Sequence, residues 1–339
     1  MTARRILVTG GAGFIGFHLT HRLAADAGAE LTIVDDYSRG SADEDFASLV
    51  EKPNVSVENA DLTDPAAWAK LGRGYDEVYH LAAVIGVKHV LARPHDVVRV
   101  NALSTIHLLD WFVRGGARKV LFSSTSEAYA WTRQFHELPL PTPEDVPLSL
   151  TSLADPRSSY AGSKIFGELA VNQYCRAYDA RFTVVRYHNV YGPRMGREHV
   201  IPELLERALG NEDPLMVYSP THTRAFCYVS DAVDATIAVM RDPRADGLTF
   251  NVGNDREEVA IEDLAQRIVA KVAPGVGIEP KTAANDPIER RCPDISRARS
   301  VVGYEPKVSL DEGLEATLAW YEPRLHAEAA TEAPSSPAS

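Results

Sequence analysis

The sequence predicts an α/β fold: a Rossmann-type, doubly wound parallel sheet with helices on both faces, followed by a smaller mixed α/β C-terminal lobe. The first observation is that short apolar runs alternate with segments of helical periodicity, because strands separated by helices pair in parallel through right-handed crossovers. The second is a change of rhythm after Tyr191-Gly192-Pro193, where Gly and Pro punctuate shorter elements. The third is size, since 339 residues with 45% hydrophobic content are enough for two lobes.

The short apolar runs correspond to six strands of the predicted sheet. They are expected at Ile6–Thr9, Leu31–Val34, Val55–Glu58, Glu77–Leu81, Lys119–Ser123 and Thr183–Tyr187. Residues 1–190 are therefore expected to form the main domain, and residues 191–325 mostly the smaller lobe, with some chain returning to the main domain. Helix-start signals predict lobe helices over Ile261–Val272 and Leu310–Tyr321. Residues 326–339 are rich in Ala, Glu, Pro and Ser, which is typical of a disordered tail.

The bulk composition argues against several classes of protein. A formal net charge of −12 argues against a polyanion such as nucleic acid as the main partner. No apolar run approaches the length of a membrane span, so no membrane association is expected. Cys175, Cys227 and Cys292 lie far apart without a C-x-x-C pair, which indicates neither a disulfide framework nor a zinc site. The cysteine pattern fits a reducing cytoplasm, and because the histidines form no metal-ligand grouping, no bound metal is expected.

A glycine-rich turn follows the first predicted strand. Gly10, Gly13 and Gly16 are spaced around Phe14-Ile15, at the start of a predicted helix. The first glycine permits a sharp turn, the second lets a pyrophosphate approach the backbone, and the third lets the helix pack closely on the strand. These residues are therefore predicted to bind a dinucleotide, although a ligand-free turn would use the same glycines.

The end of the second predicted strand supplies a more discriminating feature. Asp35 and Asp36 follow Leu31–Val34, about twenty residues after the glycines, where a carboxylate accepts hydrogen bonds from an adenosine ribose. A carboxylate at this place favours NAD over NADP, because it would repel a 2′-phosphate. Arg39 is close enough to bind such a phosphate instead. All three are cofactor-binding candidates, and NAD is the expected cofactor.

A tyrosine and a lysine at helical spacing follow the fifth predicted strand. Tyr160 and Lys164 are four residues apart, so both side chains lie on one face of a helix. An ammonium there is expected to lower the pKa of the phenol, leaving a tyrosinate that takes a proton from a sugar hydroxyl. The strand before them ends in Ser123-Ser124-Thr125, at the edge where such sheets bind ligands. Thr125 is expected to hydrogen-bond the reacting hydroxyl.

A long segment between these two clusters carries few periodic apolar residues. It covers residues 131–156 and contains Pro139, Pro141, Pro143, Pro147 and Pro156. Long ordered loops are often functional, which favours part of a substrate lid. A proline-stiffened surface excursion fits the same composition equally well.

These motifs, in this order over roughly residues 4–322, resemble the extended short-chain dehydrogenase/reductases, and among them the NAD-dependent nucleotide-sugar epimerase/dehydratase family. The resemblance implies catalysis by Thr125, Tyr160 and Lys164. It implies cofactor contacts from Asp61 and Leu62 at the adenine, from Leu81, Ala82 and Ala83 near the ribose, and from Ser123, Tyr187, His188 and Val190, with Asn101 steadying the central helix. Most relatives carry an apolar aromatic residue at position 188.

The same resemblance implies a nucleotide-diphosphate sugar as substrate. Asn189, Arg224 and Arg291 would hold the diphosphate, which fits the grip of a guanidinium fork on phosphate oxygens; surface ion pairs are the alternative for the arginines. Asp294 would bind the nucleotide ribose, and Ser126 and Glu127 would contact the sugar. Relatives often dimerise through the helix that carries Tyr160 and the preceding helix, here around residues 101–114, so a homodimer is expected.

The resemblance leaves the reaction open after a first oxidation of a sugar hydroxyl, commonly at C4, by bound NAD. The first prediction is an epimerase, which lets the keto sugar turn over and returns the hydride. The alternative is a nucleotide-glucuronate decarboxylase or a nucleotide-sugar dehydratase, because Thr125-Ser126-Glu127 resembles the pattern in both and Glu127 could remove the C5 proton. Ser126 argues against the dehydratase, which often has Asp there, and Ala161-Gly162-Ser163 argues against the decarboxylase, which usually has acidic residues there.

Three further alternatives remain, for Glu127, for the fold as a whole and for the reaction. Glu127 could be a structural carboxylate that caps backbone amides. The whole fold could serve as a non-catalytic dinucleotide-binding sensor, although such a protein would be expected to lose Tyr160 or Lys164. A net reductase that consumes NADPH is disfavoured by Asp35.

Overall fold

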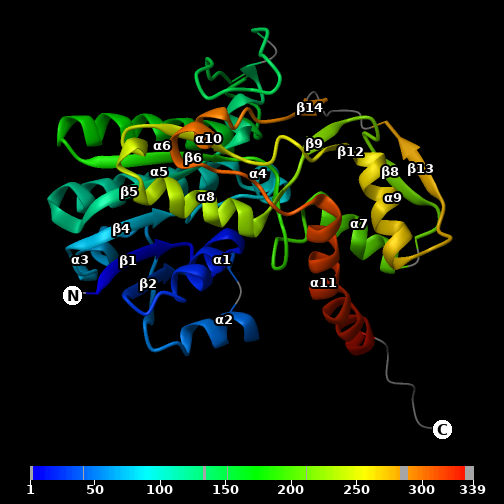
Figure 1. The fold of residues 1–339 in the computed structure, drawn as a ribbon, viewed down its shortest axis with the longest axis horizontal. Coiled ribbons are helices and arrows are strands. Elements are labelled where there is room, and N and C mark those ends of the chain that lie inside the picture. The colour runs from blue at the N-terminus through cyan, green and yellow to red at the C-terminus, as the bar shows by residue number, and fades with distance from the viewer. Residues whose placement is uncertain are drawn as a thin grey trace.

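The computed structural model describes residues 3–40, 42–132, 135–150, 152–210, 212–282 and 289–332. Its largest unit is a seven-stranded sheet in the order β11-β6-β5-β4-β1-β2-β3, in which every neighbouring pair is parallel (Figure 1). The strands are β1 (Arg4–Thr9), β2 (Ala29–Asp35), β3 (Val55–Asn59), β4 (Tyr75–His80), β5 (Ala117–Thr125), β6 (Arg181–Tyr187) and β11 (Thr249–Val252). The predicted fold class is therefore confirmed.

Helices cover both faces of this sheet, because successive side chains of each strand point to opposite sides. Ile6 and Val8 of β1 pack with α1, α2, α8 and α10, whereas Leu7 packs on the other side with α3, α5 and α6. Both faces are thus removed from water, as is usual for a parallel sheet. These helices are α1 (Phe14–Leu23), α2 (Glu44–Val50), α3 (Pro65–Lys70), α5 (Pro94–Trp111), α6 (Ser158–Ala177), α8 (Val229–Arg241) and α10 (Ser296–Val302).

The strand order places a crevice at one edge of the sheet. β1 lies between β2 and β4, so the chain is wound to opposite sides of β1. Ligands of such sheets bind outside the carboxyl ends of the strands at this reversal. The glycine turn follows β1, Asp35 ends β2 and Thr125 ends β5, so all three lie at that edge.

The seventh strand lies in the segment that the sequence assigns mostly to the smaller lobe. β11 pairs with β6 at the edge of the main sheet, and its Phe250 and Val252 are fully buried, as is Asn251 between them. A run of four residues that alternates apolar and polar side chains is too short to predict a sheet strand. Together with α8 and α10, it returns the chain to the main domain.

The smaller lobe packs α7 (Val200–Leu209), α9 (Ile261–Val272) and α11 (Leu310–Glu332) around a separate core. Ile201, Leu205, Leu264 and Leu314 are fully buried there. The lobe and its junction also hold short strand pairs, β7 with β10, β8 with β13, and β9 between β12 and β14. Their bounds are β7 (Val190–Tyr191), β8 (Leu215–Tyr218), β9 (Thr223–Ala225), β10 (Cys227–Tyr228), β12 (Glu258–Ala260), β13 (Ile278–Lys281) and β14 (Arg290–Arg291).

The C-terminal helix is longer than the sequence predicts. α11 begins at Leu310 as expected but continues past His326 to Glu332. In this extra part, Glu328 forms an ion pair with Arg197 at 2.5 Å, which connects the helix to the segment before α7. The rest of the predicted tail, residues 333–339, lies outside the described residues. None of the described helices is both long and apolar enough to cross a bilayer.

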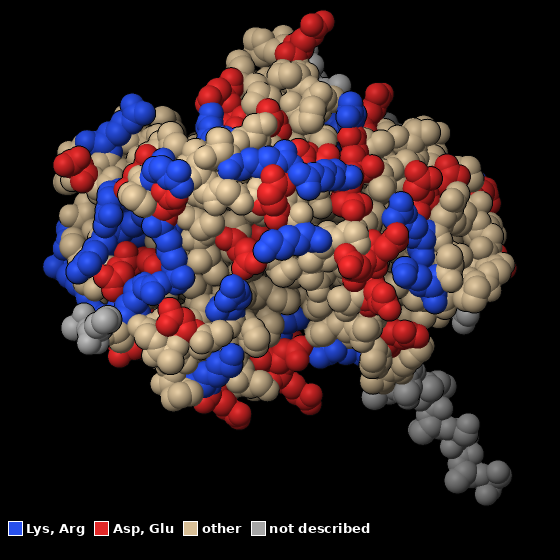
Figure 2. Space-filling view, viewed as in Figure 1, with Lys and Arg blue, Asp and Glu red and all other residues tan. Residues whose placement is uncertain are grey.

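The remaining helical segments are short. They are α4 (Val87–Ala92), η1 (Phe112–Gly116), η2 (Ser126–Tyr129) and η4 (Pro243–Ala245). On the surface, acidic and basic side chains are interspersed over the face shown in Figure 2. The net charge of −12 is therefore not gathered into one acidic patch on that face.

Candidate active site

A cleft of about 1120 Å³ opens at the carboxyl ends of the sheet strands and extends to the smaller lobe. Every predicted catalytic, cofactor-binding and substrate-binding residue lines it except Asn101, His188 and Asp294. Its wall runs from the glycine turn past the ends of β2, β4 and β5 to Arg224 and Arg291 of the lobe. The fold therefore gathers into one cavity groups that are far apart in the chain.

The glycine turn has the close contacts that its motif predicts. Gly10 has a φ of +73°, and a Cβ there would lie 2.7 Å from the backbone nitrogen of Ala82. A Cβ at Gly16 would lie 2.0 Å from the Gly10 carbonyl oxygen, so the first turn of α1 packs directly on the loop. The N-terminus of α1 thus lines the cleft, where free N–H groups and the helix dipole suit a pyrophosphate.

Asp35 is held in the cleft wall beside this turn. Its carboxylate is 8% exposed and accepts hydrogen bonds from the backbone N–H groups of Ala12 and Tyr37, each at 2.9 Å. Burial raises the pKa of this carboxyl, and the two N–H groups lower it. Its remaining lone pairs can accept ribose hydroxyls, whereas a 2′-phosphate would be repelled. The glycine turn and Asp35 together fit NAD.

The other residues at this end of the cleft surround Asp35. Asp36 accepts a hydrogen bond from the Ser38 backbone at 2.9 Å, and Arg39 lies near Gly86 and Glu198. Asp61 and Leu62 follow β3, and residues 81–83 follow β4. All of them line the cleft, so contacts with the adenosine of the cofactor remain their predicted role.

Lys164 of α6 reaches the end of β5. Its ammonium donates to the Ser123 carbonyl oxygen at 2.8 Å and to the Ser123 hydroxyl at 3.4 Å. The side chain also lies over the Phe122 ring, 5.1 Å from its centroid. Burial lowers the pKa of Lys164 to about 8, and the negative charge of Glu168 limits this fall.

Tyr160 lies one helical turn before Lys164 and hydrogen-bonds Thr125. Burial raises the pKa of the phenol, the hydrogen bond to Thr125 lowers it, and the charge of Glu127 raises it. The predicted lowering of the phenol pKa by Lys164 is not found in the protein alone. The main physical reason is burial of the phenol, which favours its neutral form, and the Lys164 ammonium is directed at Ser123.

Glu127 lies in η2, a short helix that begins directly after Thr125. Its carboxylate forms an ion pair with Arg291. Its backbone N–H donates to the Thr125 hydroxyl at 3.2 Å. Arg291 belongs to β14, which pairs with β9 so that Arg291 lies opposite Arg224. The Nε of Arg291 is buried and has no hydrogen-bond partner among the described residues. A cation and a carboxylate thus lie side by side next to the Thr125–Tyr160 pair.

Asn101 and His188 lie behind the cleft wall. The Asn101 side chain accepts from the Val84 backbone N–H at 2.7 Å and donates to the Val84 carbonyl and to Ser163, so it joins α5 to the loop after β4 and to α6. His188 is 2% exposed, its Nε2 lies 3.0 Å from Asn251 Oδ1, and burial lowers its pKa to about 4. Asn101 therefore has the geometry of its predicted steadying role, while a nicotinamide contact of His188 stays a prediction.

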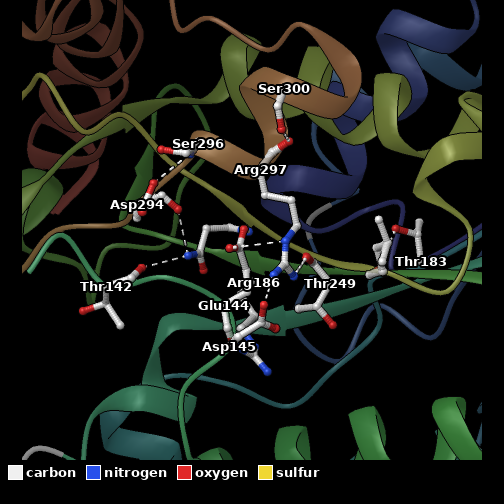
Figure 3. A network of polar contacts seen from close by, with 12 residues as sticks. Thr142, Glu144, Asp145, Thr183, Arg186, Thr249, Asp294, Ser296, Arg297 and Ser300 are labelled. Atoms are coloured by element: carbon white, nitrogen blue, oxygen red, sulfur yellow. Dashed lines mark hydrogen bonds and ion pairs between the residues drawn. The ribbon is translucent and has the colours of Figure 1, made fainter. Parts of the chain in front are cut away.

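Asp294 lies at the start of α10, away from the cleft lining. Its carboxylate accepts the Ser296 backbone N–H at 2.8 Å, and its carbonyl accepts a hydrogen bond from Asn251 (Figure 3). The contact with Ser296 is that of an Asx turn that leads into α10. Binding of a nucleotide ribose by Asp294 stays a prediction.

The cleft has a wall that the motifs do not predict. Residues 194–199 and the outer half of α11 line it, and Arg194 stacks on Phe17, 4.1 Å from the ring centroid, while pairing with Asp43. On α11, Arg324 bonds Asp45 at 3.0 Å. The periodicity of α11 shows which of its faces is apolar. It does not show that the polar face contacts α2, so no sequence signal identified this wall of the cleft.

The proline-rich segment is held by hydrogen bonds to residues outside it. Trp131 at its start and Arg157 directly after its end line the cleft. In its middle, Thr142 bonds the backbone of Cys292 and Asp294, and Glu144 accepts the Asn251 backbone N–H at 2.9 Å. Residues 133, 134 and 151 lie outside the described part of the chain. A role of the segment as a substrate lid stays a prediction.

Among the described residues no three His, Cys, Asp or Glu side chains are grouped to hold an ion. Cys175, Cys227 and Cys292 are buried and unbridged.

Comparison with known proteins gives the family. The family model described as "NAD dependent epimerase/dehydratase family" matches residues 6–253. UDP-glucuronic acid decarboxylase 3 of Arabidopsis thaliana is 34% identical over 313 residues, covering 91% of this chain and 86% of the relative. UDP-N-acetyl-alpha-D-glucosaminuronate decarboxylase of Bacillus cytotoxicus is 32% identical over 334 residues, covering 94% and 98%.

Solved structures give the same result. UDP-glucuronic acid 4-epimerase from Bacillus cereus, in complex with UDP-glucuronic acid and NAD, has a TM-score of 0.83 and 25% identity, covering 94% of this chain and 99% of that one. UDP-glucose 4-epimerase from Thermotoga maritima has a TM-score of 0.81 and 28% identity, covering 95% and 99%. With the glycine turn, Asp35 and the Tyr160–Lys164 pair in place, the chain belongs to the NAD-dependent epimerase/dehydratase family of nucleotide-sugar-modifying enzymes.

Proposed function

We propose that this enzyme decarboxylates a nucleotide-diphosphate uronate of the UDP-glucuronate type. This proposal reverses the order that the sequence alone favours, in which an epimerase comes first. The observation that carries it is the Glu127–Arg291 ion pair beside Thr125 in the cleft. The curated decarboxylases, which match over most of this chain, add support.

The first step needs a proton acceptor at the C4 hydroxyl of the sugar. Tyr160 is proposed as that acceptor, with Thr125 bonded to its phenol as the group that orients the hydroxyl. Bound NAD supplies a reversible acceptor for the hydrogen and electron pair leaving C4, and a positive ring charge that favours a phenolate. The Lys164 ammonium, which is bonded to Ser123, adds a second positive charge that favours the phenolate of Tyr160.

Decarboxylation follows from the chemistry of the oxidised sugar. With a ketone at C4 and a carboxylate on C5, the C5–C6 bond can break, and its electron pair moves to the C4 oxygen as carbon dioxide leaves. C5 then takes a proton, and reduction at C4 restores a hydroxyl. A uronate carboxylate needs a cation to orient it and a nearby acid to return the proton to C5.

Arg291 and Glu127 are placed to supply these two roles. Arg291 lines the cleft, and since a guanidinium binds carboxylates well, it is proposed to hold the carboxylate of the substrate in place of the diphosphate contact that the resemblance implies. Glu127 is 37% exposed in its side chain, so it can exchange protons with water and pass one to C5. Arg224, opposite Arg291 in the strand pair, is proposed to hold the diphosphate.

A uronate 4-epimerase is the second candidate. It is favoured by the similarity to the epimerase solved with UDP-glucuronic acid and NAD. That reaction would require the keto sugar to turn over in the cleft while its carboxylate stays in place.

The test is incubation of the purified protein with UDP-glucuronate labelled with ¹³C in its carboxyl group, alongside UDP-glucose, UDP-N-acetylglucosamine and GDP-mannose. Release of labelled carbon dioxide and formation of a pentose nucleotide, followed by NMR and mass spectrometry, is the expected result. An isomer of unchanged mass would establish the epimerase instead, and loss of water would establish a dehydratase. Conversion of the neutral sugars alone would remove the uronate from the proposal.

We also propose that two copies associate through α5 and α6. Val98 on α5 is 47% exposed, and Phe166 and Leu169 on α6 are 40% and 57% exposed. The two helices lie side by side on one face of the sheet (Figure 1). A second copy would cover these apolar side chains. Leu169→Asp is expected to give a monomer in sedimentation analysis, whereas Leu153→Asp, at a loop residue that is 89% exposed, should leave the assembly unchanged.

A further inference from the structure

A buried carboxylate lies on α6 one turn beyond Lys164. Glu168 is 6% exposed and accepts three hydrogen bonds from two other elements. The Ser124 hydroxyl donates to its Oε1 at 2.5 Å, and the Arg186 guanidinium donates to Oε1 at 2.8 Å and to Oε2 at 2.6 Å. Glu168 therefore joins α6 to β5 and β6 at the same point.

The partner of this carboxylate is equally enclosed. Arg186 is 5% exposed, and its remaining contacts go to the Tyr129 hydroxyl at 2.6 Å and the Glu144 carbonyl at 3.0 Å. Figure 3 shows Arg186 within a wider polar network that continues through Glu144 to Asp294. Asn251 links these members, because it bonds Tyr129, Glu144 and the carbonyl of Asp294.

Stability alone is a weak reason for such a pair. Removing two charges from water costs free energy that their attraction only partly returns, and apolar replacements are often neutral or stabilising. The position of the pair supplies another reason, because α6 carries the catalytic groups. Three consecutive residues of β5 each bond α6: Ser123 holds Lys164, Ser124 holds Glu168, and Thr125 holds Tyr160.

We propose that Glu168 is a positioning residue of the active site, which locks α6 to the ends of β5 and β6 and keeps Lys164 in its ammonium form. The titratable and charged groups around Lys164 are Tyr160 and Glu168 on its own helix, His80 at the end of β4, and Arg186 behind Glu168. Glu168 is the negative charge among them. The proposal goes beyond the decarboxylase assignment and rests only on the oxidation step shared by the family.

The direction of the effect follows from the charges. Burial lowers the pKa of Lys164 to about 8, and Glu168 opposes that shift. In Glu168→Gln the ammonium loses its nearby anion, so it should deprotonate at a pH lower by about 1 unit. The alkaline limb of kcat should move down by the same amount.

The direct readout is an NMR titration of ¹⁵N-lysine-labelled holoenzyme, with the Lys164 signal assigned from Lys164→Ala. It reports protonation whichever reaction the enzyme performs, so its failure is distinct from failure of the proposed function. Glu168→Gln should lower the titration midpoint of Lys164, and Glu168→Asp, which keeps the charge, should leave it close to that of the wild type. Displacement of Tyr160 should also lower kcat of Glu168→Gln by about 10-fold or more at the optimal pH with little change in KM.

Glu144→Gln is the matched control, because Glu144 is a buried carboxylate of the same network that does not contact α6's catalytic residues. It should leave the Lys164 midpoint unchanged. If Glu168→Gln does not fold, Glu168→Gln combined with Arg186→Gln leaves no unpaired buried charge and should still lower the midpoint. A folded Glu168 variant with an unchanged midpoint and an unchanged kcat profile would overturn the proposal, as would an equal shift in Glu144→Gln.

Discussion

Arg291 of β14 forms an ion pair with Glu127, which lies two residues after Thr125, although 164 residues separate Arg291 from Glu127 in the chain. The pair connects the smaller lobe to the end of β5 across the cleft. Docking of the lobe therefore completes the site, because it brings a guanidinium to a carboxylate that the main domain alone would leave exposed. The consequences can be tested one residue at a time.

Arg291→Gln is expected to lower kcat for decarboxylation by about 10²-fold, because the guanidinium proposed to hold the substrate carboxylate is lost. The rate is measured as release of labelled carbon dioxide at saturating substrate. Arg290→Gln is the control, since the neighbouring Arg290 pairs with Glu258 at 2.6 Å and is 46% exposed in its side chain. Equal losses in both variants would assign the effect to the folding of β14 rather than to the cleft.

Tyr160→Phe removes only the phenol hydroxyl and should reduce turnover by roughly 10²- to 10⁴-fold, the usual contribution of a positioned acid or base. Bound NAD, measured after denaturation of the purified protein, should remain. Tyr174→Phe provides the matched change on the same helix, because the Tyr174 hydroxyl contacts Asp110 at 3.5 Å and does not line the cleft. Turnover of Tyr160→Phe within about threefold of wild type would show that another group takes the proton.

Asp35→Asn should narrow the preference for NAD over NADP by about 10-fold or more, because the negative charge that repels a 2′-phosphate is removed. The measurement is the ratio of the two dissociation constants by calorimetry on cofactor-free protein. Asp36→Asn should change the ratio less, since Asp36 bonds the Ser38 backbone in the following turn. Tighter binding of NADP than of NAD by the wild type would contradict the assignment of Asp35 to the ribose.

Acid should destabilise the fold before the carboxylates titrate. Burial lowers the pKa of His80 to about 3 and that of His188 to about 4. Below an unfolded pKa of about 6.5, the unfolded chain binds protons that the native protein excludes. The free energy of unfolding should therefore fall by about 1.4 kcal/mol per pH unit for each histidine as the pH drops toward these native values.

Urea unfolding at a series of pH values between about pH 6 and pH 4.5 measures this slope. His188→Phe should reduce it by about one proton, because only His80 then remains of the pair. His95→Phe should leave it unchanged, since the His95 side chain is 76% exposed. A slope that is the same in His188→Phe and in the wild type would mean that His188 is protonated in the native state.

Much of the cleft was predictable because its features are local in the sequence. The glycine turn depends on a few consecutive backbone conformations, and Asp35 follows an apolar run that can only be a buried strand. Tyr160 and Lys164 share a helix face by spacing alone. Because parallel strands end at one edge, these segments meet once the sheet forms.

Other parts of the site depend on how distant segments pack. β11 is a short strand with two polar residues, and it became recognisable only through its pairing with β6 and the burial of Asn251. The pKa of Tyr160 was predicted in the wrong direction for the protein alone, because the spacing of Tyr160 and Lys164 does not reveal how deeply the phenol is buried, and burial raises its pKa.

The sequence by itself determined the α/β class, the dinucleotide motif and the placement of Tyr160 and Lys164 on one helix face, because turn chemistry and side-chain periodicity act over a few residues. Only the tertiary structure decided that Arg291 forms an ion pair with Glu127 and that Glu168 forms one with Arg186. It also decided that α11 forms part of the wall of the cleft. These contacts join residues far apart in the chain, and they form where the packing of whole elements brings complementary groups together.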